Sequence, residues 1–317
     1  AEALSIRWKP TPHDKLDSAT ISKNMAAALA RPTAADAKRT DGDWDAARKS
    51  AARTVTADYE VPYLAHAPME PWTATVRFNA DGTLDVWAPT QAQDRLLAAI
   101  TAASGLPAEK VRIHTTLLGG GFGRRLRDVE GIRDAVLTAK AMNRPVRFFW
   151  TREDEIGQGW YRPAQMARLT ATLDAQGQVT GLNIRTAGPS MIMDFAAPAT
   201  PIQEGGLDMT SVQSLHDTRY RFGAYRLSYA MAREPVPTAP WRAVGSTQES
   251  GWGTPLAVGR ARGIAYVESY GSLCAEVVEA SLVDGRPKVH KVTVALDPGH
   301  IVSRDGVLSQ CEGGVIQ

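Results

Sequence analysis

The chain has 317 residues, of which 44% are hydrophobic and 22% charged, and its formal net charge is +2. This is ordinary globular composition at a length sufficient for two domains, and the small net charge gives no indication of nucleic-acid binding. The two cysteines, Cys274 and Cys311, are too few for a disulfide framework or for an iron–sulfur cluster, which needs about four cysteine ligands.

Other common signals are also missing from the sequence. No run approaches the about 18 apolar residues of a membrane-spanning helix, and no signal peptide opens the chain. The first residue is Ala1 and not Met, which indicates processing or an excised fragment. The histidines are scattered, and neither H-E-x-x-H nor C-x-x-C occurs, so no protein-ligated metal site is predicted. No serine lies in a G-x-S-x-G motif.

In chain order, the predicted elements alternate between strands and helices. Residues 9–48 are polar, and we interpret them as a connecting segment with one helix near its middle. Hydrophobic periodicity and turn residues predict strands at 3–8, 54–61, 73–78, 83–87, 111–118, 146–150, 166–174, 178–186, 221–231, 263–270, 274–283 and 288–296, and helices at 22–30, 91–104 and 128–142. A helix is also expected to start near Ser309. These elements predict the α+β class, with mixed sheets and packed helices.

The run Gly119-Gly120-Gly121-Phe122-Gly123-Arg124-Arg125 lies between a predicted strand and a predicted helix. Glycine permits positive φ and close approach of a ligand, and backbone N–H groups with a helix N-terminus behind them suit an anion. No frame of the run matches G-x-G-x-x-G or the P-loop motif. One interpretation is a tight turn with solvated arginines. Four glycines around one aromatic residue exceed what a turn needs and favour a binding site.

A second candidate lies in the proline-rich stretch 235–246. A rigid segment of this kind can aim the guanidinium of Arg242 at a fixed target, although a solvated loop arginine is the alternative.

Four stretches together resemble a known family. They are the G-G-G-F-G run, residues 59–71, residues 240–248 (P-W-R-A-V-G-S-T-Q) and residues 297–314. In order and spacing they are similar to the molybdopterin-binding large subunits of the xanthine dehydrogenase and aldehyde oxidoreductase family. The branch they most resemble contains the isoquinoline 1-oxidoreductase β-subunit and the membrane-associated aldehyde dehydrogenases of bacteria.

The resemblance implies roles for particular residues. Gly121 and Phe122 would bring their backbone next to the ligands of the molybdenum, and Gly120 and Gly123 would permit that approach. Arg242 would lie near the pterin and the metal, and Gln310 would hydrogen-bond the pterin. Arg124 and Arg125 would either face the pyrophosphate of the cofactor or be structural.

This sequence also departs from the family pattern. Leu64 stands where xanthine dehydrogenase-type members often carry glutamine, two residues before His66. The family's glutamate base lies beyond Gln317, so no catalytic residue is assigned, and we interpret Glu70, Glu249 and Glu312 as structural. A long segment that the family usually has between Ser250 and Gly251 is missing. We therefore expect a fragment in three parts: 1–48, the end of a preceding domain with a connecting segment; 49–250, a first molybdopterin-binding domain; and 251–317, the truncated start of a second.

The implied activity is oxidation of aldehydes or N-heterocycles, with water as oxygen donor and glutamate as general base. The implied cofactor is molybdopterin in its cytosine dinucleotide form. The implied partners are a small subunit with [2Fe–2S] clusters and a cytochrome c, and the implied location is periplasmic or membrane-associated. Without the glutamate, we expect the isolated chain to be inactive. Two alternatives stay open: a non-catalytic binding or scaffold module with the same fold, and a different α/β enzyme whose glycine loop binds another anionic cofactor, such as a flavin.

Overall fold

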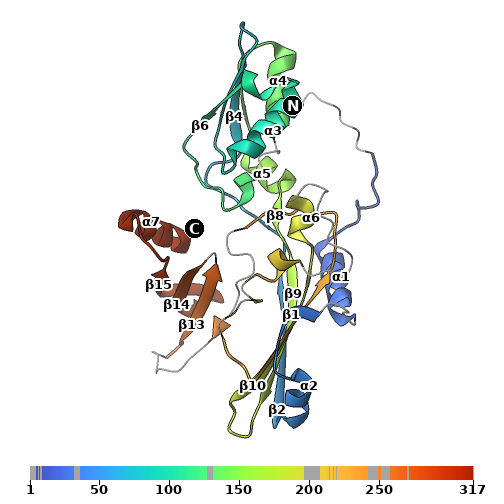
Figure 1. Ribbon diagram of the computed structural model, residues 1–317, viewed down its shortest axis with the longest axis vertical. Helices are drawn as coiled ribbons and strands as arrows, with labels where there is room; N and C mark the ends of the chain where they lie inside the picture. Colours follow the sequence, from blue (N-terminus) through green and yellow to red (C-terminus); the bar gives the residue numbers. More distant parts are fainter. Residues whose placement is uncertain are drawn as a thin grey trace. The chain divides into compact units, whose positions relative to one another are not determined.

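A computed structural model describes most of the chain (Figure 1). The described residues are 5, 7, 9–31, 36–126, 131–195, 208–213, 215–216, 218, 220–241, 249–250, 258–269 and 271–316. The chain divides into two compact units, Ala1–Ser211 with Phe222–Val244 and Val212–Arg221 with Gly245–Gln317. The three predicted domain ranges stay a prediction.

The first unit contains a four-stranded mixed sheet with two helices on one face (Figure 1). Its strand order is β6-β5-β4-β7, and only the β5–β6 pair is parallel. The elements are β4 (Thr73–Phe78), β5 (Leu84–Ala88), α3 (Gln93–Ser104), β6 (Val111–Thr115), α4 (Ile132–Met142) and β7 (Val146–Phe149), with the short helical turns η1 (Ala108–Lys110) and η2 (Arg124–Leu126) between them.

The helices form because their apolar residues recur at helical spacing. Leu96 and Ile100 of α3 are buried, as are Ile132 and Val136 of α4, and together with the sheet they form one core. The helix α3 ends at Gly105, whose φ of +76° closes the last turn in the left-handed conformation that glycine adopts without strain. Truncating one of these core side chains to alanine is expected to cost about 2–5 kcal/mol.

A five-stranded mixed sheet forms the rest of the first unit. Its order is β1-β11-β10-β9-β2, and β10 and β11 are parallel. The strands are β1 (Asp36–Asp41), β2 (Arg53–Val61), β9 (Gln165–Leu173), β10 (Val179–Gly188) and β11 (Ala224–Met231). Around them lie α1 (Ser18–Ala30), α2 (Trp44–Ser50), the pair β3 (Leu64–Ala65) and β8 (Tyr161–Arg162), α5 (Arg152–Gln158), α6 (Met191–Phe195) and η3 (Met209–Ser211). Helix α1 buries Met25, Ala28 and Leu29 in a second core.

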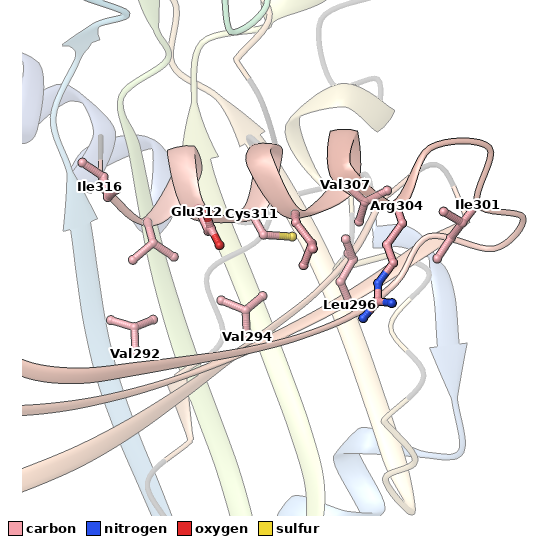
Figure 2. A pocket seen from close by; sticks show the side chains of 11 residues that line it. Val292, Val294, Leu296, Ile301, Arg304, Val307, Cys311, Glu312 and Ile316 are labelled. Atoms are coloured by element: carbon pink, nitrogen blue, oxygen red, sulfur yellow. The ribbon is translucent and has the colours of Figure 1, made fainter.

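The second unit is an antiparallel sheet with one helix. Its strands in order are β12 (Glu249–Ser250), β13 (Arg260–Ser269), β14 (Ser272–Val283) and β15 (Arg286–Asp297), and the helix is α7 (Arg304–Ile316). Figure 2 shows Val292 and Val294 of β15 facing α7. Both residues line a groove between the strand and the helix with a volume of about 550 Å³. None of the helices in the described part of the chain is long and apolar enough to span a membrane.

The predicted α+β class with mixed sheets is confirmed, and the differences are local. The segment predicted as connecting contributes the edge strand β1 and the helix α2. Strand β6 ends at Thr115 and not at Leu118, and α4 begins at Ile132, with residues 127–130 outside the described range. The glycine run is followed by the helical turn η2 and then, beyond residues 127–130, by the predicted helix α4. The predicted strand 3–8 lies largely outside the described residues.

Candidate functional site

The glycine run forms a tight turn after β6 with an unusual backbone. Gly120 has φ +101°, Phe122 has φ +52° and Gly123 has φ +103°. Phe122 is not a glycine, so its left-handed conformation costs about 1–2 kcal/mol. From Gly120 to Phe122 a residue with ordinary φ stands between two with positive φ, and alternation of this kind can turn successive N–H groups toward a common concavity, called a nest, which binds anions. A strained residue inside such a turn marks a candidate functional site.

The middle of this turn has backbone donors to spare. Within the part of the chain that the structure describes, the N–H groups of Gly120, Gly121 and Phe122 have no hydrogen-bond acceptor. Gly121 is buried and Gly120 half-buried, so an unsatisfied N–H there is costly unless a ligand accepts it. The turn thus offers three consecutive donors, and the two that follow Gly120 are those that the sequence analysis assigned to a cofactor.

Glu70 holds the start of the turn through its side chain and its backbone. Its carboxylate Oε2 accepts from the Gly119 N–H at 3.0 Å, and its own N–H donates to the Gly119 carbonyl, also at 3.0 Å. A Cβ at Gly119 would lie 2.5 Å from Glu70 Cβ, so only glycine fits without a shift. The Glu70 carbonyl in turn accepts from Arg125 Nη2 at 3.0 Å. These contacts give Glu70 a structural role.

Gln91 holds the end of the turn. Its Oε1 accepts from the Gly123 N–H at 3.2 Å, and its backbone N–H donates to the Arg125 carbonyl at 3.1 Å. The carboxamide lies against Gly121, because a Cβ there would overlap Oε1 and lie 2.9 Å from Cδ. Gly121 must therefore lack a side chain for Gln91 to occupy this position.

The stem of the second predicted loop packs against the same turn. A Cβ at Gly123 would overlap the carbonyl oxygen of Pro240 and lie 2.6 Å from its carbonyl carbon. Buried His66 hydrogen-bonds the same carbonyl through Nε2 at 2.8 Å, and its ring lies 4.5 Å from that of Trp241. Burial lowers the pKa of His66 to about 4, so the ring is neutral at pH 7. Because the carbonyl can only accept, Nε2 carries the proton.

The two arginines after the turn point into the protein, so the interpretation as solvated side chains was wrong. Arg124 is 3% exposed and Arg125 is 1% exposed. Arg124 Nη1 lies 3.5 Å from Glu155 Oε1, and its guanidinium fits only because residue 159 is glycine. Burial raises the pKa of Glu155, and the nearby guanidinium groups oppose that shift. The two buried arginines therefore anchor the end of the turn in the protein interior.

The loop opposite the turn is held by the same charged cluster. Arg152 pairs with Glu155 and donates from Nη2 to the Pro68 carbonyl at 2.6 Å. Ala67, in this loop, has φ +42°, a second left-handed residue that is not glycine. A Cβ at Gly120 would lie 3.1 Å from the Pro68 side chain, so the strained loop and the strained turn are in contact.

The other two predicted site residues are Arg242 and Gln310. Arg242 lies outside the described residues, although Trp241, which precedes it, is described. Gln310 lies on α7 in the second unit and is exposed. Its neighbours Cys311 and Glu312 line the groove between α7 and β15, as Figure 2 shows, and Gln310 does not. Its role stays a prediction.

The pattern of the sequence predicted neither the contact of Gln91 with the turn nor that of His66 with the second loop. Gln91 and Gly123 are 32 residues apart, and His66 and Pro240 are 174 residues apart. No local spacing connects such pairs, because they meet only through the fold.

Comparison with known proteins agrees with this architecture. The structure of quinoline 2-oxidoreductase from Pseudomonas putida 86 matches at a TM-score of 0.53 with 17% identity, over 69% of this chain and 28% of that one. The fold is thus that of a molybdenum hydroxylase large subunit. Residues 28–250 match the family described as molybdopterin cofactor-binding domain. The chain therefore belongs to the molybdopterin-binding large subunits of the xanthine dehydrogenase family.

Its curated relatives bear the names of oxidoreductase subunits. The isoquinoline 1-oxidoreductase subunit beta of Brevundimonas diminuta is 26% identical over 79% of this chain and 38% of its own length. The membrane-bound aldehyde dehydrogenase [pyrroloquinoline-quinone] of Gluconacetobacter polyoxogenes is 28% identical over 59% of this chain and 24% of its own length. The aldehyde oxidoreductase molybdenum-binding subunit PaoC of Escherichia coli is 29% identical over 52% and 22%. The chain thus spans well under half of these relatives.

Proposed function

We propose that the turn Gly120–Gly123 holds the molybdopterin cofactor, with the N–H groups of Gly121 and Phe122 donating to its anionic or oxo ligands. The observation that carries the proposal is the set of unaccepted N–H groups next to a strained Phe122, in a chain of this family. Gly120 and Gly123 permit the backbone conformation, and Glu70 and Gln91 hold it in place. Donors fixed before a ligand arrives need no reorganisation, which is how such sites stabilise developing charge.

Arg242 and Gln310 are proposed as further contacts of the cofactor. Support for Arg242 comes from its neighbour Trp241, whose ring contacts buried His66 beside the glycine turn. The guanidinium group of an arginine suits an anionic pterin or phosphate group, with which it can form two parallel hydrogen bonds. Gln310 has an exposed carboxamide, which can donate and accept at once.

The full protein is proposed to oxidise aldehydes or N-heterocycles with water as oxygen donor. When bound, the cofactor supplies the two-electron redox chemistry, and the chain binds and orients it. Glu70 is unsuited to be the general base, because its carboxylate accepts from Gly119. We therefore also propose that the 317-residue chain does not turn over substrate by itself. Oxidation of an aldehyde or N-heterocycle by the purified chain would contradict this.

We propose that the electrons from the reaction pass to partner proteins. The only two cysteines, Cys274 and Cys311, cannot ligate a cluster alone. A small [2Fe–2S] subunit, with a cytochrome c beyond it, fits this need, and the cofactor form proposed is the cytosine dinucleotide. A periplasmic or membrane-associated location is proposed because one relative is named as membrane-bound.

The test is the cofactor content of the chain, expressed in a host that makes molybdopterin. Molybdenum by plasma mass spectrometry, pterin fluorescence after oxidation and released cytidine nucleotide are measured on the purified protein. We expect stoichiometric molybdenum with pterin. Gly121→Ala should abolish both, because its Cβ would displace the Gln91 carboxamide, whereas Gly82→Ala, with nothing within 4 Å, should retain them.

The same assay separates the alternatives. A folded wild-type chain that contains neither molybdenum nor pterin would contradict the proposal and favour a scaffold module with this fold. A chain that carries a flavin, or the quinone in the name of one relative, would identify a different cofactor.

A further inference from the structure

Arg152 extends from the start of α5 to the loop opposite the glycine turn. Its Nη2 donates to the carbonyl of Pro68 at 2.6 Å and to that of Met69 at 3.2 Å. Its Nη1 pairs with the carboxylate of Glu155, about one turn further along the same helix. One planar guanidinium thus holds two consecutive backbone carbonyls and a carboxylate at once, which its rigid fork of donors permits.

Glu155 connects this arginine to the glycine turn. It is fully buried, and its second oxygen, Oε1, lies 3.5 Å from Nη1 of Arg124. The Arg124 guanidinium also donates to the Glu155 backbone carbonyl at 3.2 Å. Arg124 closes the turn itself, since its N–H donates to the Gly121 carbonyl at 2.8 Å. The carboxylate therefore links the loop 67–70 to the end of the turn, with one arginine on each oxygen.

The helix that carries Arg152 and Glu155 begins at a fixed point of the fold. Thr151 and Asp154 form a reciprocal capping box that orders its first turn. The preceding Trp150 donates its N–H to the carbonyl of buried Trp72 at 2.9 Å. The start of α5 is thus attached to the core of the four-stranded sheet, so Arg152 holds the loop against a rigid part of the protein.

The loop 67–70 has a conformation that needs such a restraint. Ala67 has φ +42°, and a left-handed residue that is not glycine persists only where its surroundings impose it. The loop contacts the glycine turn through Glu70 and through the side chain of Pro68. If Arg152 released the two carbonyls, Ala67 would relax and both contacts would shift. The strained Phe122 would then lose the support that keeps its N–H in place.

We propose that Arg152 is a positioning residue of the glycine turn. Together with Glu155 it sets the distance between the loop 67–70 and the turn, and it thereby keeps the N–H groups of Gly121 and Phe122 directed at their ligand. It acts through the loop and not by contact with the ligand. The proposal rests on the function proposed above and adds the part of the fold that holds the donors in place.

Two substitutions separate positioning from ordinary support of the fold. Arg152→Gln removes both the charge and the fork of donors. Arg152→Lys keeps the charge beside Glu155, but one ammonium group cannot hold the carboxylate and both carbonyls in the geometry of a guanidinium. Lysine should therefore restore an ion pair and fail to restore the loop. Arg144→Gln is the control, because Arg144 is exposed and no described residue pairs with it.

The first measurement reads the geometry of the loop without any ligand. In the isotope-labelled chain, the nuclear Overhauser effect between the Pro68 side chain and the Gly120 α-protons reports their contact, because the Cβ position of Gly120 lies 3.1 Å from Pro68 Cβ. We expect this signal in the wild type and in Arg144→Gln, and we expect both Arg152 variants to weaken it. The thermal midpoint of Arg152→Lys should stay within about 2 °C of the wild type, as for a small change in stability.

The second measurement reads the donors. Molybdate is titrated into each chain, and the amide resonances of Gly121 and Phe122 are followed. Both Arg152 variants should bind it about tenfold or more weakly, since the apparent affinity falls with the fraction of molecules in which the donors are in place. Arg144→Gln should stay within about twofold of the wild type, because an exposed charge is screened.

Three results would overturn the proposal. One is an affinity lost in Arg152→Gln and restored in Arg152→Lys, which would reduce Arg152 to an ion pair. Another is an unchanged contact between Pro68 and Gly120 in both variants. The third is a thermal midpoint that falls as far in Arg152→Lys as in Arg152→Gln, because the defect would then be one of folding. A wild-type chain that binds neither molybdate nor pterin counts against the proposed function, while the contact measurement still decides the role of Arg152.

Discussion

The substitution Gly123→Ala tests the packing that joins the glycine turn to the second loop. Gly123 has φ +103°, and an alanine there pays about 1–2 kcal/mol for a left-handed conformation. Its Cβ would also overlap the Pro240 carbonyl oxygen and lie 2.6 Å from the carbonyl carbon. Both neighbours are backbone atoms, which cannot rotate away as a side chain can.

The magnitude is the sum of these two effects. Relieving the overlap requires Pro240 to move, which breaks the hydrogen bond from His66 at about 1 kcal/mol, and it strains the packed stem by about 1–3 kcal/mol. We expect Gly123→Ala to lower the free energy of unfolding by about 3–6 kcal/mol. Gly82→Ala, at φ +76° with nothing within 4 Å, should cost only the conformational part, about 1–2 kcal/mol.

Urea unfolding of the wild type and both variants measures the difference. A double-mutant cycle of Gly123→Ala with His66→Gln should show coupling, because both changes disturb the same Pro240 carbonyl. Equal costs for Gly123→Ala and Gly82→Ala would refute the reasoning. So would additive effects in the cycle.

Three further outcomes follow from buried titratable groups. Glu155→Gln should lower stability by about 3–5 kcal/mol in thermal unfolding, because buried Arg124 loses its carboxylate, while exposed Glu153→Gln should change it by less than about 0.5 kcal/mol. The lowered pKa of His66 means that the folded state disfavours the charged form of the ring. The contribution of His66 to the free energy of unfolding should therefore be full above pH 6.5 and should fall by about 3 kcal/mol as the pH drops toward 4. His66→Gln should flatten this profile, and an unchanged profile would contradict the assignment. Hydrogen bonds, of which the one from a histidine has the largest effect, hold the pKa of Asp85 well below its usual range. The contribution of Asp85 to the free energy of unfolding should be present above about pH 4 and lost below it. Asp85→Asn should remove that acid sensitivity in pH-dependent unfolding.

The features that sequence could predict are those with a local signal. The apolar spacing of Leu96 and Ile100 predicted α3, and the glycines around Phe122 predicted a tight turn. Strand β1 had no such signal: its six residues, D-A-K-R-T-D, carry a single apolar side chain, and it is a strand only because β11 pairs with it. Edge pairing of this kind is a tertiary effect that overrides propensity.

The side chains that support the glycine turn were not predicted for the same reason. Glu70 was visible as a carboxylate near a motif, but its hydrogen bond to Gly119 spans 49 residues. The burial of Arg124 was equally hidden, because arginine is usually solvated and only the Glu155 carboxylate makes an interior position tolerable.

The order of strands in the first unit has a consequence for how the site matures during synthesis. The core around α3 and α4 is built wholly from residues between Trp72 and Trp150, so this part can close once that stretch has left the ribosome. The five-stranded sheet must wait for β11, which pairs with β1 and β10. The glycine turn and its contact with Gln91 therefore form early. The contact between His66 and Pro240, which are 174 residues apart, forms last. A nascent chain should thus pass through a stage in which the glycine turn is shaped and still open on the side that Pro240 later covers.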